Sequence, residues 1–338
     1  MTPDSSMPSP ALIMETLTAY QRMAALQAAI DLSLFTAIAE GNSTVPQLAK
    51  RCAASERGLR ILCDFLTILG FLTKADASYA LSPTAAVFLN QHSPVYLGGV
   101  SGFLLHPFVT RGYDDLATTV RRGHPPADHN SVGPENPIWV DFARCMAPMM
   151  RPVAMRMAGF LDLADRPAKI LDIAAGHGLF GIACAQQAPG AHITAVDWAP
   201  VLGVALENAQ AAGVADRYQT RPGSAFDVDF GTGYDVVLLT NFLHHFDEPT
   251  NITLLKKVRA ALAPGGRVFT LEFVPNADRV SPPQAAGFSL QMLTSTQTGD
   301  AYTYAQLSAM CQAAGFARSE LHDLSPLMNS LVISYSQP

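Results

Sequence analysis

The segment Lys169-Ile-Leu-Asp172-Ile-Ala-Ala-Gly176-His-Gly178 (residues 169–178) is the clearest fold signal in the chain. Its first half is a short apolar and β-branched run that predicts a buried strand, and a helical pattern begins near Leu179. A strand that passes through a glycine turn into a helix lets the backbone approach a ligand closely, because glycine has no Cβ. We therefore expect a ligand-binding turn here.

Asp197 stands nineteen residues after Gly178, at the end of the next expected strand. A carboxylate there can accept hydrogen bonds from both ribose hydroxyls of an adenosine ligand. Gly176-His-Gly178-Leu-Phe-Gly181 also matches the GxGxxG pattern of nicotinamide dehydrogenases. Asp172 gives the pattern DxxxGxG, which favours a different adenosine cofactor in this C-terminal position. A purely structural turn, with both aspartates capping elements, is the third interpretation.

The rest of the C-terminal half continues the alternation of strands and helices. Short β-branched runs lie at residues 169–174, 191–197, 234–240 and 267–273. This spacing predicts a parallel sheet with helices on both faces.

The N-terminal part follows a different pattern. Helical periodicity covers residues 11–40, about 45–53 and 55–69, and residues 71–83 predict a small hairpin. Three helices and a two-stranded wing describe a winged-helix module. Residues 1–93 hold six basic and seven acidic side chains, whereas a DNA-reading module is distinctly basic. The module is therefore expected to pair protein chains.

Composition supports a folded protein of two domains. The chain has 338 residues, of which 49% are hydrophobic and 15% charged, which excludes wholesale disorder. A net charge of -6 makes a nucleic-acid partner unexpected. The five cysteines form no CxxC pair, and the N-terminus lacks the pattern of a secretory signal. We expect a cytoplasmic protein with no membrane partner.

Two later motifs recur in the order of one known family. Gly223-Ser224-Ala225-Phe226 stands where that family has a Gly-Asp-x-Phe turn against an adenine, and Pro264-Gly265-Gly266 is its turn before a strand. With the glycine turn, residues 169–275 resemble the core of S-adenosylmethionine-dependent methyltransferases. From about residue 11 onward, the chain resembles the small-molecule O-methyltransferases with an N-terminal winged-helix dimerisation domain, of the plant caffeic acid and acetylserotonin type.

This resemblance implies an α/β fold, with a Rossmann-like, mostly parallel seven-stranded methyltransferase sheet and an N-terminal all-α winged-helix dimerisation domain. The implied division is a flexible N-terminus at 1–10, the dimerisation domain at 11–95, a helical linker and substrate cap at 96–155, and the cofactor-binding domain at 156–338. The implied assembly is a homodimer.

The implied cofactor is S-adenosyl-L-methionine, with S-adenosyl-L-homocysteine as its product, and no metal is expected. Ser224 replaces the family's acidic residue, and Thr240 stands where plant members keep a lysine. The candidate cofactor-binding residues are Asp172, Gly176, Gly178, Asp197, Trp198, Gly223, Ser224, Ala225, Phe226, Thr240 and Asn241.

His244 matches the family's catalytic base, because Leu-His-His-Phe stands here for Leu-His-Asp-Trp. Imidazole titrates near pH 6.5 and suits removal of a phenol or enol proton. Glu272 matches the acid that orients this histidine in relatives. The second acid of plant relatives is replaced by Ala301, so either Glu272 acts alone, or Asp300 substitutes for it, or proton removal matters little.

His245 takes the place of the family's acidic residue. Neighbouring residues on a strand point to opposite faces, so we expect its side chain to point away from that of His244 or to make an aromatic contact.

The substrate side is expected on an apolar segment, Phe142-Ala-Arg-Cys-Met146-Ala-Pro-Met149-Met150, which resembles the Phe-Asn-x-x-Met segment of relatives. Met292 and Asn241 are further pocket candidates by position, although such spacing also suits ordinary core packing. The implied reaction is methyl transfer to a hydroxyl of an aromatic or polyketide-like small molecule in secondary metabolism. Alternatives are a C- or N-methyltransferase, a relative that catalyses a non-methylating reaction, and a ligand-sensing transcription factor.

Overall fold

The computed structural model describes residues 8–129, 131, 136–163 and 167–337. Residues 1–7 of the expected N-terminal segment, and residues 130 and 132–135 of the expected loop, lie outside the described residues. The chain forms two compact units, Met1–Ser101 and Gly102–Pro338, and each is described by itself. Within the described ranges, no helix is long and apolar enough to cross a membrane.

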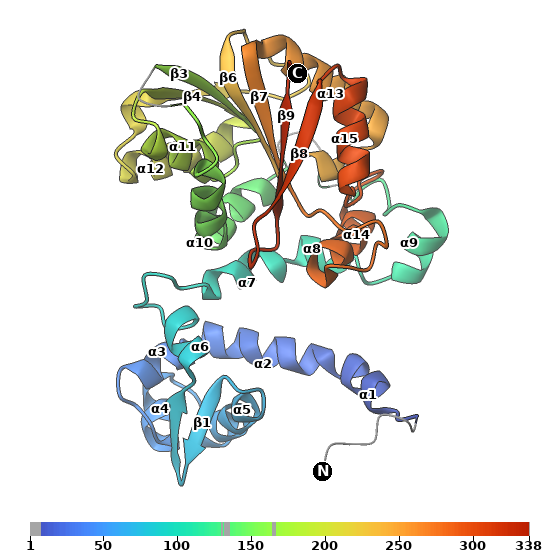
Figure 1. Cartoon of the computed structure of the whole chain (residues 1–338). Helices are drawn as coiled ribbons and strands as arrows, with labels where there is room; N and C mark the ends of the chain where they lie inside the picture. Colours follow the sequence, from blue (N-terminus) through green and yellow to red (C-terminus); the bar gives the residue numbers. More distant parts are fainter. Residues whose placement is uncertain (1–7, 130, 132–135, 164–166, 338) are drawn as a thin grey trace. The chain divides into compact units, whose positions relative to one another are not determined.

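The N-terminal unit is a set of short helices with one hairpin (Figure 1). Its elements are α1 (Ala11–Leu17), α2 (Ala19–Asp31), α3 (Leu34–Ala39), α4 (Val45–Arg51), α5 (Glu56–Ile68), β1 (Leu72–Ala75), β2 (Ser78–Leu81), α6 (Pro83–Phe88) and the 3-10 turn η1 (Gly98–Val100). The helix expected over 11–40 is divided, because Thr18 separates α1 from α2 and Ser33 is left-handed with φ 51°.

Helix α5 shows how local sequence builds this unit. The Ser55 side chain accepts a hydrogen bond from the backbone N–H of Gly58, as expected for an N-cap. Leu59, Cys63 and Leu66 lie on one helical face and are buried in the core of the unit. The hairpin follows directly, with Leu72 paired to Leu81.

The C-terminal unit starts with helices and continues as alternating strands and helices. The first helices are α7 (Ser101–Leu104), which begins at the boundary of the units, α8 (Pro107–Arg111), α9 (Leu116–Arg122) and α10 (Ile138–Ala158). The strands are β3 (Ala168–Ile173), β4 (Ala191–Asp197), β5 (Tyr218–Pro222), β6 (Tyr234–Thr240), β7 (Leu262–Glu272), β8 (Arg318–Asp323) and β9 (Ser330–Tyr335). Between them lie α11 (Leu179–Gln187), α12 (Ala199–Ala211), η2 (Ala215–Arg217), η3 (Leu243–His245), α13 (Glu248–Ala261), α14 (Pro283–Ser295) and α15 (Tyr304–Ala313).

The seven strands form one sheet in the order β5-β4-β3-β6-β7-β9-β8. Strands β3 to β7 pair in parallel, and β9 runs antiparallel to both of its neighbours. The expected mostly parallel seven-stranded sheet is thus confirmed.

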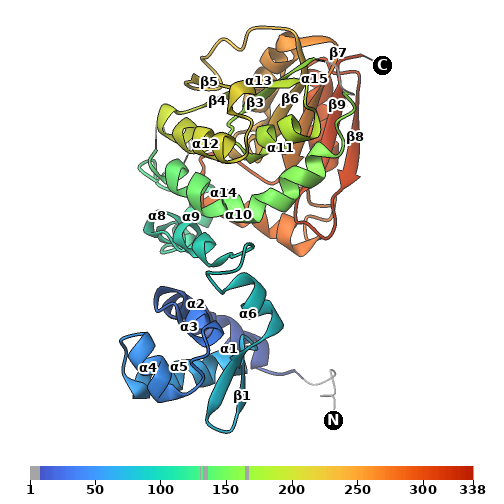
Figure 2. The same ribbon diagram turned by 90° about the vertical axis from the view of Figure 1, so that its left-hand side faces the viewer.

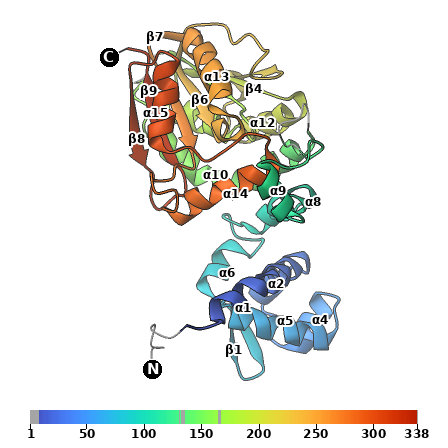
Figure 3. The same ribbon diagram turned by 90° about the vertical axis from the view of Figure 1, so that its right-hand side faces the viewer.

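Helices cover both faces of this sheet. Ile170 and Val236 point to the face that packs against α10, α11 and α12, which Figure 2 shows. Leu171 and Val237, one residue further along each strand, point to the face that packs against α13 and α15, which Figure 3 shows. Because both faces are buried, the strands are continuously apolar rather than alternating.

Strand order reverses between β3 and β6, the two neighbours at the centre of the sheet. Ligands of open α/β sheets bind beside the carboxyl ends of the strands at such a point. The glycine turn after β3, Asp197 at the end of β4 and Asn241 after β6 all lie at this edge.

Candidate active site

A cavity of about 580 Å³ lies at the carboxyl edge of the sheet, within the C-terminal unit. The loops after β3, β4, β5 and β6 form one part of its lining, and side chains of α10 and α14 form another. Its size suits a small molecule or cofactor. Asp197 is the one charged carboxylate among the described residues that line it, and these include no lysine or arginine.

The Asp197 carboxylate accepts two backbone hydrogen bonds, one of them from the glycine turn. Its Oδ2 accepts from the N–H of Gly176 at 2.8 Å, and its Oδ1 accepts from the N–H of Trp198 at 2.7 Å. Burial raises the pKa of Asp197 to about 6, although both bonds act in the opposite direction. Gly176 has φ 56°, a backbone conformation that residues other than glycine adopt rarely. The turn is therefore built around a partly exposed carboxylate that faces the cavity.

Asp172 and Gly178 lie behind this turn and do not line the cavity. Asp172 is fully buried, and its Oδ2 accepts from the N–H of Gly181 at 3.0 Å. Burial raises the pKa of Asp172 to about 7. A Cβ on Gly178 would come within 2.7 Å of the Tyr218 hydroxyl. Both residues therefore hold the turn in shape from outside the lining, and their part in cofactor binding stays a prediction.

The other candidate cofactor residues line the cavity. Those on the loops after β4 and β5 and at the end of β6 are Trp198, Gly223, Ser224, Ala225, Phe226, Thr240 and Asn241. The Ser224 hydroxyl accepts from the N–H of Phe226 at 3.1 Å and so caps its own turn. Asn241 has φ 53°, and its side-chain oxygen accepts from Asn329 at 2.9 Å.

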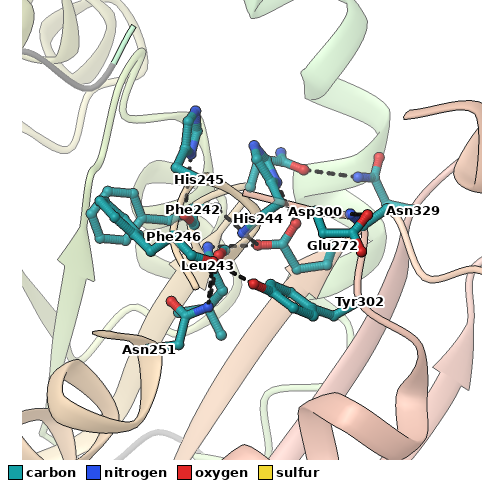
Figure 4. A network of polar contacts seen from close by, with 12 residues as sticks. Phe242, Leu243, His244, His245, Phe246, Asn251, Glu272, Asp300, Tyr302 and Asn329 are labelled. Atoms are coloured by element: carbon teal, nitrogen blue, oxygen red, sulfur yellow. Dashed lines mark hydrogen bonds and ion pairs between the residues drawn. The ribbon is translucent and has the colours of Figure 1, made fainter. Parts of the chain in front are cut away.

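His244 and Glu272 form the central polar contact of the site (Figure 4). His244 Nδ1 lies 2.6 Å from Glu272 Oε2, and both side chains are buried. The other carboxylate oxygen, Oε1, accepts from the N–H groups of Phe242, Leu243 and His244 at 3.0, 2.8 and 3.4 Å. Glu272 therefore fixes both the turn that carries His244 and the orientation of its ring.

His245 lies beside His244 rather than on the opposite face. Strand β6 ends at Thr240, and η3 is a 3-10 turn, so the alternation of a strand does not apply. The two ring centroids are 4.2 Å apart, and the His245 ring makes an edge contact with Trp139 at 5.3 Å. Of the two expected alternatives, a His245 side chain that points away from that of His244 is wrong, and an aromatic contact is what the structure shows. Both rings line the cavity.

Asp300 does not take the place of the missing second acid. One carboxylate oxygen of Asp300 lies 2.9 Å from a guanidinium nitrogen of Arg279, and the other accepts from the N–H of Ala301. Within the described residues, Glu272 is the acidic side chain that contacts the His244 ring.

The side of the cavity on which we expect the substrate is apolar. Phe142, Met146, Met149, Met150 and Met292 all line it, as the sequence predicted. Met side chains adapt to irregular ligands and contact aromatic rings favourably.

Further lining residues were not predicted from the sequence. Among these are Trp139 and Phe288, and the ring of Phe288 meets that of His244 at 4.8 Å. His177 is another, and its position between Gly176 and Gly178 was the available signal. Its Nδ1 accepts from the N–H of Leu179 at 3.2 Å, and burial lowers its pKa to about 4.

No group of three or more His, Cys, Asp or Glu side chains in the described ranges is arranged to hold a metal ion.

Comparison with known proteins places the chain among proteins of related sequence and fold. Residues 140–317 match the O-methyltransferase domain family, and residues 14–91 match the O-methyltransferase dimerisation domain. The 3-hydroxy-5-methyl-1-naphthoate 3-O-methyltransferase of Streptomyces sahachiroi is 30% identical over 310 residues, 90% of this chain and 89% of the relative.

Two solved structures extend this similarity. A candidate O-methyltransferase from Nostoc punctiforme PCC 73102 has a TM-score of 0.94 and 49% identity, over 97% of this chain and all of that chain. Human N-acetylserotonin methyltransferase in complex with S-adenosylmethionine has a TM-score of 0.85 and 20% identity, over 99% of both chains. The second likeness is one of fold.

Proposed function

The chain belongs to the O-methyltransferase family, and on this basis we propose that it transfers a methyl group from S-adenosylmethionine to a hydroxyl of an aromatic or polyketide-like small molecule. The observation that carries the proposal is the His244–Glu272 contact of 2.6 Å, at one side of a cavity whose other side presents a carboxylate beside a glycine turn. A proton acceptor and a cofactor cradle thus share one enclosed space.

The residues of the cradle fit an adenosyl cofactor. Asp197 presents its carboxylate at the end of β4, where it can accept hydrogen bonds from two ribose hydroxyls. Gly176 leaves the backbone of the turn accessible, and Trp198 and Phe226 supply apolar surface for a purine. When bound, S-adenosylmethionine supplies an electrophilic methyl group. Asp172 and Gly178 support the turn from behind.

His244 is proposed as the general base. A carboxylate accepts hydrogen bonds only, so Glu272 binds the Nδ1–H tautomer and leaves the lone pair on Nε2. In this tautomer, Nε2 can take the proton of a hydroxyl in the cavity. Glu272 then stabilises the imidazolium, because the charged pair is held at 2.6 Å. Such a base contributes about 10²–10⁴-fold to the rate.

The acceptor is proposed to be an apolar aromatic compound. The side chains of Phe142, Met146, Met149 and Met292 supply an apolar surface with few hydrogen-bonding groups. The described lining offers no lysine or arginine to bind an acidic group of the acceptor. An uncharged phenol therefore fits this side better than an anion.

A panel of phenols and hydroxynaphthalenes tests the proposal. The purified protein is incubated with S-adenosylmethionine, and each product is analysed by mass spectrometry and NMR. We expect gain of one methyl group on oxygen, and loss of activity in His244→Ala. A methyl group on carbon or nitrogen, with nearly full activity of His244→Ala, would favour the C- or N-methyltransferase. A turnover product without an added methyl would favour a non-methylating reaction.

Calorimetry tests the cofactor independently of the acceptor. We expect binding of S-adenosylhomocysteine to the purified protein. Absence of that binding, together with binding of a nicotinamide dinucleotide, would refute the proposed function.

A homodimer is proposed from the N-terminal unit. Its first two helices expose large apolar side chains, namely Leu12, Ile13, Met14, Leu17, Tyr20 and Met23. These helices fall largely within residues 14–91, which match the dimerisation domain. An exposed apolar face of this kind marks a protein interface. Light scattering after size exclusion is expected to give twice the mass of the chain, and a monomer at micromolar concentration would contradict the proposal.

A further inference from the structure

The neighbouring imidazoles of His244 and His245 present two hydrogen-bond acceptors to the same part of the cavity. His245 Nδ1 lies 3.1 Å from the backbone carbonyl oxygen of Phe242. A carbonyl oxygen only accepts, so His245 Nδ1 carries the hydrogen and donates it. The lone pair of His245 therefore lies on Nε2, as it does for His244, whose Nδ1 is bound to Glu272.

Both Nε2 atoms are open to the cavity. Each ring lines the cavity. Several side-chain nitrogen and oxygen atoms of the described residues are buried without a hydrogen-bond partner, and neither Nε2 atom is one of them. Figure 4 shows the two rings projecting to the same side, with Glu272 below the ring of His244. Their centroids are 4.2 Å apart, so the two lone pairs reach adjacent positions of one ligand.

His245 stays neutral beside His244. Burial and the neighbouring His244 both hold the pKa of His245 well below its ordinary value. A neutral imidazole keeps its lone pair, so His245 remains an acceptor while His244 gains a proton during the reaction.

We propose that His245 is a specificity-determining residue, which selects acceptor molecules that carry a second hydroxyl next to the hydroxyl that is methylated. This inference rests on the proposed function. The proton of the first hydroxyl passes to His244 Nε2, the methyl group passes from sulfur to that oxygen, and the C–S bond breaks as the C–O bond forms. The second hydroxyl keeps its proton and donates it to His245 Nε2. Vicinal hydroxyls, or peri hydroxyls of fused rings, meet this requirement.

A matched set of probes tests the inference by binding alone. Dissociation constants for 2,3-dihydroxynaphthalene, 2-naphthol and 3-methoxy-2-naphthol are measured by calorimetry on protein saturated with S-adenosylhomocysteine. We expect the diol to bind about tenfold more tightly than the other two, the ratio that one hydrogen bond supplies. The methoxy compound keeps the second oxygen but lacks its hydrogen and adds a methyl group, whereas 2-naphthol lacks the donor and adds no bulk. Equal affinity of these two compounds therefore shows that the preference for the diol comes from the donor and not from the size of the substituent.

The variant His245→Phe removes the acceptor and keeps a flat ring. We expect its three dissociation constants to fall within twofold of one another, with 2-naphthol bound as in the unsubstituted protein. His192→Phe is the matched control, since His192 is exposed on β4 and does not line the cavity, and it is expected to keep the tenfold preference. Restoration of part of the preference by His245→Gln, which regains an amide oxygen, would support the inference.

Several outcomes would overturn it. Equal binding of the three probes by the unsubstituted protein, a preference that persists in His245→Phe, or binding of none of the probes at millimolar concentration each contradicts a selective acceptor. A preference that disappears with EDTA and returns with Zn²⁺ would indicate a metal held by the two imidazoles instead. Failure of the proposed function is separate, because the protein would then not bind S-adenosylhomocysteine before any probe is added.

Discussion

Glutamine in place of Glu272 separates orientation of His244 from the stability of the turn. The amide oxygen of Glu272→Gln can take the place of Oε1, which accepts from Phe242 and Leu243 at 3.0 and 2.8 Å. The amide NH₂ then faces His244 Nδ1, which lies 2.6 Å from the carboxylate in the unsubstituted protein. Because NH₂ donates, Nδ1 must accept, and the proton of the ring moves to Nε2.

The variant therefore holds the tautomer that cannot take a proton from the substrate. An amide in place of the carboxylate that orients a catalytic histidine has this effect in serine proteases. We expect kcat to fall by about 10²–10⁴-fold, equal to roughly 3–5 kcal/mol of transition-state stabilisation. The loss of charge on the acceptor of the backbone bonds is expected to lower the free energy of unfolding by only about 1–2 kcal/mol.

Initial rates with the best acceptor of the phenol panel measure kcat, and calorimetry with S-adenosylhomocysteine checks that the cofactor cradle is intact. Asp300→Asn is the matched acid-to-amide control, because Asp300 pairs with Arg279 and does not contact His244. Its kcat is expected to remain within threefold of the unsubstituted protein. A Glu272→Gln enzyme that keeps more than a tenth of the original kcat would refute the role given to this carboxylate.

Four further predictions concern the glycine turn. Asp197→Asn should weaken S-adenosylhomocysteine binding by about 10–100-fold in calorimetry, because ribose hydroxyls lose a charged acceptor. In the unsubstituted protein the same affinity should fall about tenfold between pH 7 and pH 5, since the raised pKa of about 6 means that Asp197 protonates in this range, and a flat profile would contradict it. Asp172→Asn keeps an acceptor for the turn and removes a buried charge. The folded-state pKa of about 7 lies above the value in the unfolded chain, so ionisation costs the unsubstituted protein stability as pH rises towards 7, and the variant's relative melting temperature should be higher at pH 8 than at pH 5. Gly178→Ala should lower the free energy of unfolding by about 1–3 kcal/mol, because φ is 75° and the Cβ would meet the Tyr218 hydroxyl, whereas Gly203→Ala, with open space at the same atom, should not.

Periodicity and turn chemistry predicted most of the fold. The continuous apolar runs of β3, β4, β6 and β7 occur only where a strand is buried on both faces, so their order in the chain implied a parallel sheet with helices on each side. Local signals such as the N-cap at Ser55 also hold, because they depend on neighbours in the sequence. The helix over 11–40 was predicted as continuous because Ser33, a left-handed residue, carries no glycine or proline signal.

The site was harder to predict than the fold. His244 and Glu272 were placed by motif, and their distance of 2.6 Å follows from adjacent strands that end at one edge. Asp172 shares a motif with ligand-binding residues, but its strand position directs the side chain under the turn and into the interior. The side-by-side rings of His244 and His245 depend on the 3-10 turn that follows β6. A turn of three residues is too short to show a periodic pattern in the sequence, so it could not be predicted.

The charges of the proposed reaction explain why Glu272 lies behind the ring of His244 and not in the lining of the cavity. When bound, a sulfonium cofactor would bring one positive charge into a space whose lining is rich in aromatic and methionine side chains, and methyl transfer would remove that charge from sulfur. In the proposed mechanism the hydroxyl proton passes to His244, so the positive charge would reappear on its ring. Glu272 lies outside the lining and 2.6 Å behind that ring, where it compensates the new charge without repelling a neutral acceptor.

His245 also adds no negative charge to the cavity. A carboxylate in its place would add a second negative charge inside the cavity and compete with Glu272 for the imidazolium. A neutral imidazole accepts a hydrogen bond without that competition, because its Nδ1–H is already bound to the Phe242 carbonyl oxygen at 3.1 Å. In the proposed mechanism, the two neighbouring histidines thus place one base beside one neutral hydrogen-bond acceptor. His245→Asp should therefore shift the acid limb of the pH–rate profile to higher pH, since a carboxylate at this position would stabilise the imidazolium of His244.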